Sequence, residues 1–225
     1  MKPEVSIIYT CHNCTDKLLD SLKTISSGSG KVLYEIIVID NESKKAIKLQ
    51  RKQPNIKIIR NRENIGFWSA LDQGALLARG EYLLLANTDI LFAPKSIEKM
   101  VIRIKSDGKI GIVAPQILGP DNIIISVRSE LSMLPRNKFF SRYKMPDVNS
   151  TKEQFVDIVD GVCILIPKHL FEKVKGFDKR LFLFFKKRDL CIKVRKAGYK
   201  NLYYPDSKIL HFGARSFQKN ARSYP

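Results

Sequence analysis

The stretch Glu-Tyr-Leu-Leu-Leu-Ala-Asn-Thr-Asp, residues 81–89, joins an apolar run to two oxygen-bearing side chains. Its apolar part, residues 82–86, has the length of a short buried strand. Asn87 and Asp89 then fall just beyond the carboxyl end of that strand, where open α/β sheets bind their ligands. Such oxygen atoms suit a hard divalent cation that also contacts substrate phosphates. An Asx-turn, in which both side chains bond nearby backbone groups, is the alternative explanation.

Strand-like and helix-like segments alternate on both sides of this stretch. Strands are predicted at 5–10, 34–39, 56–59, 82–86 and 110–114, with helices at 18–25, 44–52, 66–79 and 94–105. The Ser-Gly segment 26–30 is expected to end the first helix, and Gly80 is expected to be the C′ residue of the third. Alternation with short links predicts an α/β fold with a doubly wound, mainly parallel sheet.

The alternation loosens beyond Pro115. Later segments are predicted as strands at 123–127, 155–166, 202–204 and 209–212, as helices at 167–174 and 187–197, and as a polar loop at 134–150. Because neither a repeat nor a linker is evident, we expect one domain over residues 1–225. Its first half, about 1–115, would bind the ligand at the strand ends, and about 116–225 would form a second half with a smaller mixed sheet.

The chain is strongly basic, and the excess charge is concentrated near its end. Forty Lys and Arg against 22 Asp and Glu give a net charge of +18. Residues 161–225 carry 16 basic against four acidic side chains. This imbalance suits a polyanionic partner, namely nucleic acid, an anionic membrane surface or a phosphate-bearing substrate, although a solvated surface explains it equally well. Nucleic-acid binding rests on charge alone, without a recognition motif, and is not expected.

The remaining composition favours a folded cytoplasmic protein. Apolar runs stay far below the length of a membrane span, and the Met-Lys-Pro-Glu start enters a strand without a signal-like segment. Four cysteines are too few for a disulfide scaffold, so we expect them to be reduced. The Cys11-x-x-Cys14 spacing invites a redox or zinc interpretation, but a single pair lacks the second half of a zinc site.

Polar residues follow three of the predicted parallel strands. Cys11-His12-Asn13 follows the first strand, Asp40-Asn41 the second, and Asn87-Thr88-Asp89 the fourth. Because parallel strands end at a common edge, these groups should form one site. Asp40 can accept a hydrogen bond from the imide of a pyrimidine base, or else cap the following helix. Gly-rich dinucleotide and P-loop motifs are absent from the sequence, which argues against those two kinds of nucleotide site.

Eight segments in a fixed order resemble the family 2 glycosyltransferases, inverting enzymes of GT-A fold, and within them the rhamnosyltransferase-like branch. The resemblance covers about residues 4–216. It rests on residues 5–13, 35–43, 61–74 (Asn-x-x-Asn-Ile-Gly-Phe-Trp), 79–89, 161–166, 176–178 (Gly-Phe-Asp), 189–199 and 211–213 (His-Phe-Gly).

The resemblance implies sugar transfer from a dTDP-, UDP- or GDP-linked donor to a glycan or lipid-linked glycan, as in polysaccharide and cell-envelope synthesis. Such an enzyme would work in the cytoplasm, peripherally at the inner face of the membrane. The implied donor-binding residues are Cys11, His12, Asn13, Asp40, Asn64, Gly66, Phe67, Asp72, Asn87 and Thr88. The implied ligands of Mg²⁺ or Mn²⁺ are Asp89, Asn87 and His211, although His211 can equally be a structural residue.

The segment at residues 186–188 departs most from the family pattern, and Asp72, where family members often carry Asn, is a milder departure. Before Asp-Leu-Cys the family usually carries Glu-Asp-x, whose Asp is the expected base for the acceptor hydroxyl. Here the residues are Lys186-Lys187-Arg188, and a lysine is ordinarily protonated at neutral pH. Asp189 remains as the catalytic candidate, with helix capping or packing as its alternative. A second interpretation is a catalytically degenerate module that binds a nucleotide sugar or glycan without transferring it.

Overall fold

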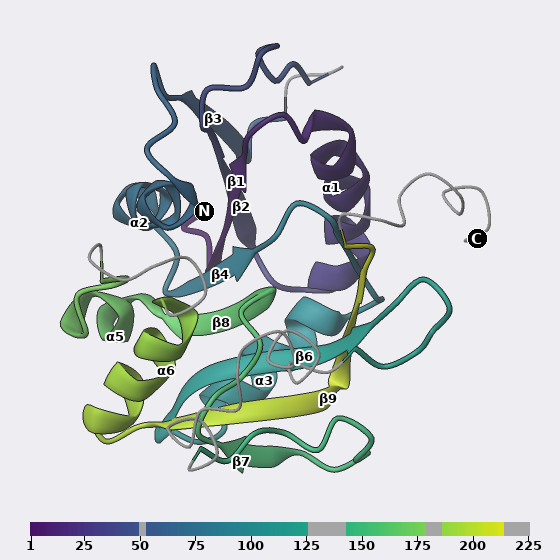
Figure 1. Ribbon diagram of the computed structural model, residues 1–225, viewed down its shortest axis with the longest axis vertical. Helices are drawn as coiled ribbons and strands as arrows, with labels where there is room; N and C mark the ends of the chain where they lie inside the picture. Colours follow the sequence, from purple (N-terminus) through teal and green to yellow (C-terminus); the bar gives the residue numbers. More distant parts are fainter. Residues whose placement is uncertain (50–52, 126–142, 179–185, 214–225) are drawn as a thin grey trace, which may run out of the picture.

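The computed structural model describes residues 1–49, 53–125, 143–178 and 186–213 (Figure 1). Over these residues the strands form one nine-stranded sheet in the order β3-β2-β1-β4-β8-β6-β9-β5, with β7 paired to β9. The strands are β1 Val5–Cys11, β2 Tyr34–Asp40, β3 Ile56–Arg60, β4 Tyr82–Ala86, β5 Ile90–Phe92, β6 Ile110–Leu118, β7 Gln154–Val156, β8 Cys163–Pro167 and β9 Lys200–His211. The helices are α1 Thr15–Ser29, α2 Phe67–Leu77, α3 Ser96–Lys105, α5 Lys168–Lys173 and α6 Lys186–Lys196.

The first four strands are parallel, as the alternation predicts. β1 pairs with β2 and β4, and β2 pairs with β3, all in the same direction. Their carboxyl ends therefore lie at one edge, with Cys11 opposite Asp40 and Tyr9 opposite Ala86. This register places the polar residues after β1, β2 and β4 side by side.

The second half of the sheet is mixed. β8 lies antiparallel between β4 and β6, while β6 runs parallel to β9. The strand predicted at 110–114 is therefore separated from β4 by β8 rather than paired with it. The mixed strands continue the same sheet, so the two predicted halves share one β-layer.

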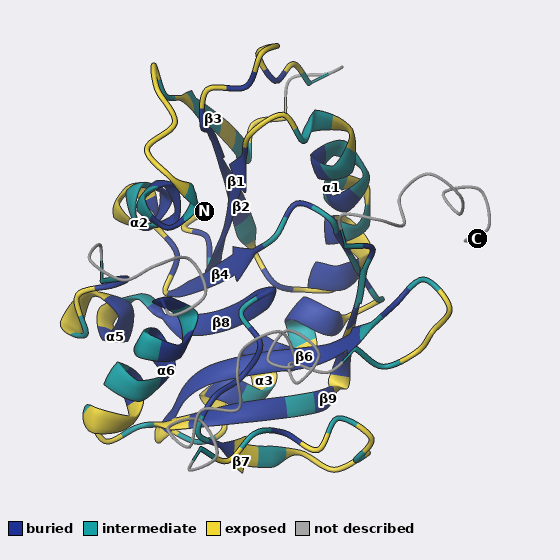
Figure 2. Ribbon diagram, viewed as in Figure 1, coloured by how far each residue is buried: buried dark blue, intermediate teal, exposed yellow. Residues whose placement is uncertain are grey.

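Helices cover both faces of the sheet, because side chains alternate along each strand. Ile7 and Leu84 face a core shared with α1 and α3, whereas Ile8 and Leu83 face a core shared with α2, α5 and α6. Figure 2 shows the central strands buried along their length between these two layers. Continuous apolar runs such as residues 82–86 are the pattern expected of strands buried on both faces.

The helix predicted at 44–52 is wrong over its described part, residues 44–49, which are not helical. Side chains bind this backbone instead: the Lys44 N–H donates to Asn13 Oδ1, and Arg60 Nη2 donates to the Ser43 carbonyl. Residues 50–52 lie outside the described part of the chain. These side-chain bonds satisfy backbone groups that a helix would otherwise pair.

Helix boundaries at glycines also differ from the prediction. α1 continues through residues 26–29, where Gly28 lets it approach β5: an added Cβ would lie 2.7 Å from Cβ of Phe92. α2 ends at Leu77, so Gly80 is not its C′ residue. Gly80 serves a close approach instead, since an added Cβ would lie 2.6 Å from the Ser6 nitrogen.

The remaining differences concern the second half. The predicted segment 155–166 is two strands, β7 and β8, and the strands predicted at 202–204 and 209–212 are the single strand β9. β5 was not predicted. Segments 123–127 and 134–150 lie partly outside the described residues; their described parts hold only a bridge from Leu118 to Ile124. No helix in the described ranges has the length and apolarity that crossing a membrane requires.

Candidate active site

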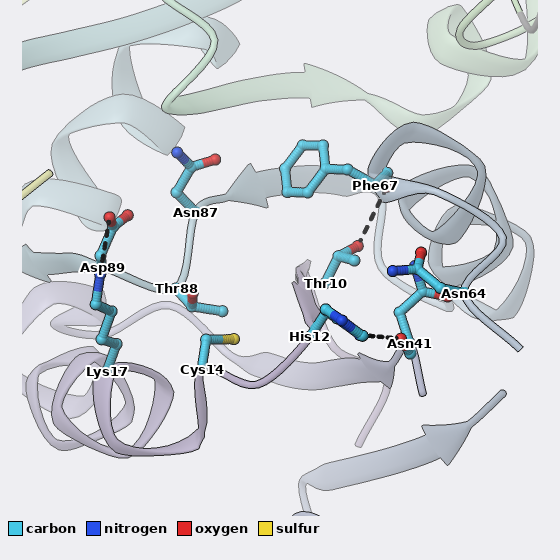
Figure 3. Close-up of a pocket in the computed structure, with 10 residues that line it drawn as sticks. All are labelled: Thr10, His12, Cys14, Lys17, Asn41, Asn64, Phe67, Asn87, Thr88 and Asp89. Carbon is cyan, nitrogen blue, oxygen red and sulfur yellow. Dashed lines mark hydrogen bonds and ion pairs between the residues drawn. The ribbon is translucent and has the colours of Figure 1, made fainter. Parts of the chain in front are cut away.

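A cavity opens at the carboxyl edge of β1, β2 and β4 (Figure 3). Asp89 and Lys17 lie at one end of it and Asn41 and Asn64 at the other, with Thr88 between them. Its lining residues are Thr10, His12, Cys14, Lys17, Asn41, Asn64, Phe67, Asn87, Thr88 and Asp89. The cavity thus collects five of the predicted donor-binding residues, His12, Asn64, Phe67, Asn87 and Thr88, and the predicted metal ligand Asp89.

The Asp89 end of the cavity is held by the pairing of β5 with β9. Ile90 is opposite His211 in that pairing, and the Phe212 N–H donates to the Asp89 carbonyl. His211 Nε2 consequently lies 3.3 Å from Asp89 Oδ1, and Lys17 Nζ lies 3.8 Å from Asp89 Oδ2. The fold therefore brings together two of the predicted metal ligands that are far apart in the sequence.

The electrostatics of this end favour an ionised Asp89. Burial raises the pKa of the Asp89 carboxyl, but the hydrogen bond from His211 and the charges of His211 and Lys17 outweigh burial. The net effect is a pKa below the ordinary value for aspartate. A carboxylate in this state is an acceptor-only group, suited to a cation.

The donor set can be tested against a divalent metal. Within the described residues there is no group of three or more His, Cys, Asp and Glu side chains that could hold one. Asp89 and His211 supply two such ligands, and the amide of Asn87 lines the same cavity. Because Mg²⁺ is commonly held by one or two carboxylates with waters and substrate phosphates, this sparse set fits a substrate-completed site.

The other end of the cavity is an amide network. Asn41 Nδ2 donates to Asn64 Oδ1 at 2.6 Å, and the Ile65 N–H donates to Asn41 Oδ1 at 3.1 Å. Gly66 opens α2 with φ +85°, a conformation that favours glycine, and its N–H donates to Asn64 Oδ1. His12 Nδ1 donates to the Asn41 carbonyl at 2.8 Å. Each side chain here is fixed by a neighbour.

Several predicted donor residues lie outside the lining. Asp40 is 1% exposed, with its oxygens accepting from Ser43 N–H and Arg60 Nη1. Asp72 Oδ1 accepts from the Phe177 N–H at 3.3 Å, beside the turn after α5. Asn13, with φ +56°, accepts from the Lys44 N–H and donates through Nδ2 to His12 Nε2 at 3.0 Å. Their roles toward a donor stay predictions.

The cavity also contains residues that the sequence argument did not assign. Thr10, Cys14, Lys17 and Asn41 line it. The sequence does contain a pattern that indicates Lys17, because Lys17 falls in the first turn of a helix that starts directly beyond a strand end. Asn41 belongs to the polar pair at the end of β2, of which the sequence argument predicts only Asp40 as a donor-binding residue.

The expectation of four reduced cysteines is wrong for one pair. Cys11 and Cys14 are joined as a disulfide, with their Cα atoms 5.6 Å apart. Cys163 and Cys191 are free and buried, and burial raises the pKa of the Cys191 thiol to about 11. The disulfide fixes Cys14 at the cavity and leaves Cys11 within the core.

The segment with the missing acids forms the start of α6. Lys186 and Arg188 are each 8% exposed, and Lys187 Nζ lies 3.7 Å from Asp160 Oδ1. Asp189 pairs with Lys193 on the same helix at 2.7 Å. Neither Lys187 nor Asp189 lines the cavity, so the donor residues and the predicted catalytic residue are not in one pocket here.

The sheet order and the strand-edge site define the class: this is the GT-A fold of glycosyltransferases. A GalNAc-T7 structure with UDP, GalNAc and Mn²⁺ matches 94% of this chain with a TM-score of 0.71 and 18% identity. A mannosyltransferase from Pyrobaculum calidifontis, with GDP-Man and Mn²⁺, matches 94% with a TM-score of 0.66 and 16% identity. The chain spans 44% and 57% of those two structures.

The profile of glycosyl transferase family 2 matches residues 6–175, and the chain belongs to this family of enzymes. The N-acetylglucosaminyl-diphospho-decaprenol L-rhamnosyltransferase of Mycobacterium tuberculosis is 24% identical over 249 residues, covering 99% of this chain and 79% of its own length. The low-salt glycan biosynthesis hexosyltransferase Agl10 of Haloferax volcanii is 21% identical, covering 88% of this chain and 64% of its own. The rhamnosyltransferase-like assignment made from the sequence is confirmed at the level of the family.

Proposed function

We propose that this enzyme transfers a sugar from a nucleoside-diphosphate sugar to a glycan or lipid-linked glycan, with inversion at the anomeric carbon. The observation that carries the proposal is the Asp89–His211 pair, 3.3 Å apart, at the edge where three parallel strands end. A fixed amide network at the far end of the same cavity supports a bound nucleoside.

The chain's own residues divide the donor between them. His12, Asn41 and Asn64 would position the nucleoside, with Asp40 as the proposed partner of the base behind them. Lys17 would place a cation near the diphosphate. Asp89, His211 and Asn87 would hold Mg²⁺ or Mn²⁺, which would neutralise the charge that develops on the leaving diphosphate.

The acceptor and the location are supported by similarity and charge. The mycobacterial relative is named for a diphospho-decaprenol acceptor, and both structural neighbours are described with nucleotides or nucleotide sugars and Mn²⁺. A net charge of +18 suits an anionic membrane surface or an acceptor diphosphate. We therefore place the enzyme at the cytoplasmic face of a membrane, bound peripherally.

The test is donor binding followed by turnover. Calorimetric titration with UDP-, GDP- and dTDP-sugars, with and without Mn²⁺, should find at least one donor whose binding needs the metal. That donor should then be turned over with a diphospho-polyprenol-linked N-acetylglucosamine as acceptor, and NMR of the product should show inversion. Failure of every donor to bind would overturn the proposal. Binding without transfer or hydrolysis would instead favour a degenerate binding module.

A further inference from the structure

At the start of α6 the base that the proposed transfer needs is missing, and the residues that line the donor cavity do not supply it. An inverting transfer needs a base for the acceptor hydroxyl, and Lys187 occupies the position where a carboxylate is expected. A protonated lysine donates hydrogen bonds but accepts none. The base must therefore be a group other than Lys187.

Asp189 is poorly placed for this task. Two helical residues differ by about 200° around the axis, so Asp189 and Lys187 face nearly opposite sides of α6. Asp189 is bonded to Lys193 at 2.7 Å, and Lys193 in turn donates to the Gly176 carbonyl. Asp189 is thus ion-paired with a lysine that contacts the turn after α5.

Asp160 is the carboxylate that meets the side chain at the expected base position. Its Oδ1 is 3.7 Å from Lys187 Nζ. The side chain of Lys187 packs closely against Gly161. A Cβ added to Gly161 would lie 2.6 Å from Cδ of Lys187, so only glycine fits there without a shift. The Val162 N–H also donates to Asp160 Oδ1 at 3.0 Å.

The same loop touches the metal end of the donor cavity. The Asn87 N–H donates to the Val162 carbonyl at 2.9 Å, which joins the end of β4 to the residue that fixes Asp160. The carboxylate is 8% exposed, so it is shielded from water yet reachable. The Asp160 carboxylate is thus held in place by a backbone N–H and a lysine, and its loop is bonded to the residue after β4 that lines the cavity.

We infer that Asp160 is the catalytic base of the proposed transfer and that Lys187 is its positioning residue. The acceptor hydroxyl gives its proton to the Asp160 carboxylate while its oxygen bonds to the anomeric carbon. The bond from that carbon to the nucleoside diphosphate breaks, and its electron pair leaves with the diphosphate. In this proposal the base is Asp160, on the loop before β8. Lys187 occupies the α6 position where the family pattern carries an Asp. This inference rests on the proposed function.

The test compares Asp160→Asn with Asp157→Asn, which removes a carboxylate three residues away that pairs with Arg195. The readout is donor turnover, to acceptor or to water, together with calorimetric affinity for the bare nucleoside diphosphate and Mn²⁺. We expect Asp160→Asn to lower turnover about 10²- to 10⁴-fold with affinity unchanged within about twofold. Asp157→Asn should keep turnover within about threefold. In Asp160→Ala, added formate should restore part of the turnover, which a purely structural role would not allow.

Each outcome decides between the two proposals. Wild-type protein that binds no nucleoside diphosphate sugar overturns the proposed function. Wild-type protein that binds a donor but neither transfers nor hydrolyses it overturns the role of Asp160 while leaving donor binding intact. Full turnover in Asp160→Asn, or a loss confined to Asp189→Asn, also overturns that role.

Discussion

The donor cavity and the start of α6 handle charge in different ways. In the cavity, the anionic Asp89 is retained where the family pattern expects it, and His211 and Lys17 surround it. At the start of α6, the expected acids are replaced by cations, and the nearby carboxylate comes from Asp160 on a separate loop. If the proposed roles hold, donor binding depends on specific strand-end positions, whereas the acid on the acceptor side is supplied from another segment.

The largest expected effect comes from removing the acid of the donor end. Asp89→Asn should lower donor turnover by about 10³-fold, because stabilising the leaving diphosphate is worth several kcal/mol. It should also abolish the effect of Mn²⁺ on donor affinity in calorimetry. Thr88→Ser, which keeps the neighbouring hydroxyl, is the matched control. Metal-dependent binding that survives in Asp89→Asn would show that the strand end is only a turn.

Restoring the family acid on α6 should be harmful rather than helpful. Lys187→Asp would place a second carboxylate beside Asp160, where like charges disfavour ionisation, so turnover should fall about tenfold or more. Lys187→Met, which removes the cation alone, should be less harmful. Steady-state kinetics and thermal unfolding of both variants separate catalysis from folding. A gain of turnover in Lys187→Asp would show that the catalytic base acts from α6 and not from Asp160.

Substitutions in the amide network of Asn41 and Asn64 should lower donor affinity more than they lower turnover. Asn64→Ala leaves Asn41 Nδ2 and the exposed Gly66 N–H without their shared acceptor, and the buried Asn41 amide alone accounts for a loss of about 1–3 kcal/mol. The dissociation constant of the donor should rise about tenfold with turnover at saturation nearly unchanged. Asn149→Ala, at an exposed position in the second half, is the control. Equal donor affinity in both variants would show that the nucleoside does not bind at the amide network.

Much of the cavity at the strand ends could be predicted from the sequence, because its residues directly follow strands that local apolar runs predict. The apolar run 82–86 specifies β4, and its parallel pairing with β1 follows from the alternation of strands and helices. The direction of β8 could not be predicted, since an apolar run fits either orientation in a buried sheet. The non-helical segment 44–49 depends on side-chain bonds from Asn13 and Arg60, which no local pattern reveals.

The pairing of Asp160 with Lys187 lies beyond local pattern for the same reason. It depends on the loop before β8 meeting the first turn of α6, a contact between segments that are distant in the sequence. The sequence does show the substitution at Lys187, and that departure was the useful signal. Adjacency in sequence favours Asp189 as the base, whereas helical geometry places it on nearly the opposite side of α6 from Lys187.

The smallest expected effect concerns the scaffold beneath both regions. Glu35 on β2 accepts hydrogen bonds from Ser6 Oγ and from the backbone and side chain of Arg79. Burial raises the pKa of Glu35, but these bonds outweigh it and hold the pKa below the ordinary value. The stabilisation is therefore complete above the pKa of glutamate in the unfolded chain, about 4.3, and is lost as the pH falls through the folded-state pKa.

Glu35→Gln should accordingly lower the free energy of unfolding by about 1–2 kcal/mol at neutral pH, and the gap to wild type should narrow in acid. Urea unfolding at neutral pH and near pH 3.5 measures both quantities. Glu172→Gln, which removes an exposed partner of Lys168, should change stability by less than about 0.5 kcal/mol. A gap that stays constant with pH would mean that Glu35 acts by packing rather than by charge. Because neither substitution touches the cavity or α6, donor affinity and turnover should stay at wild-type values, which separates the scaffold from the two regions that it supports.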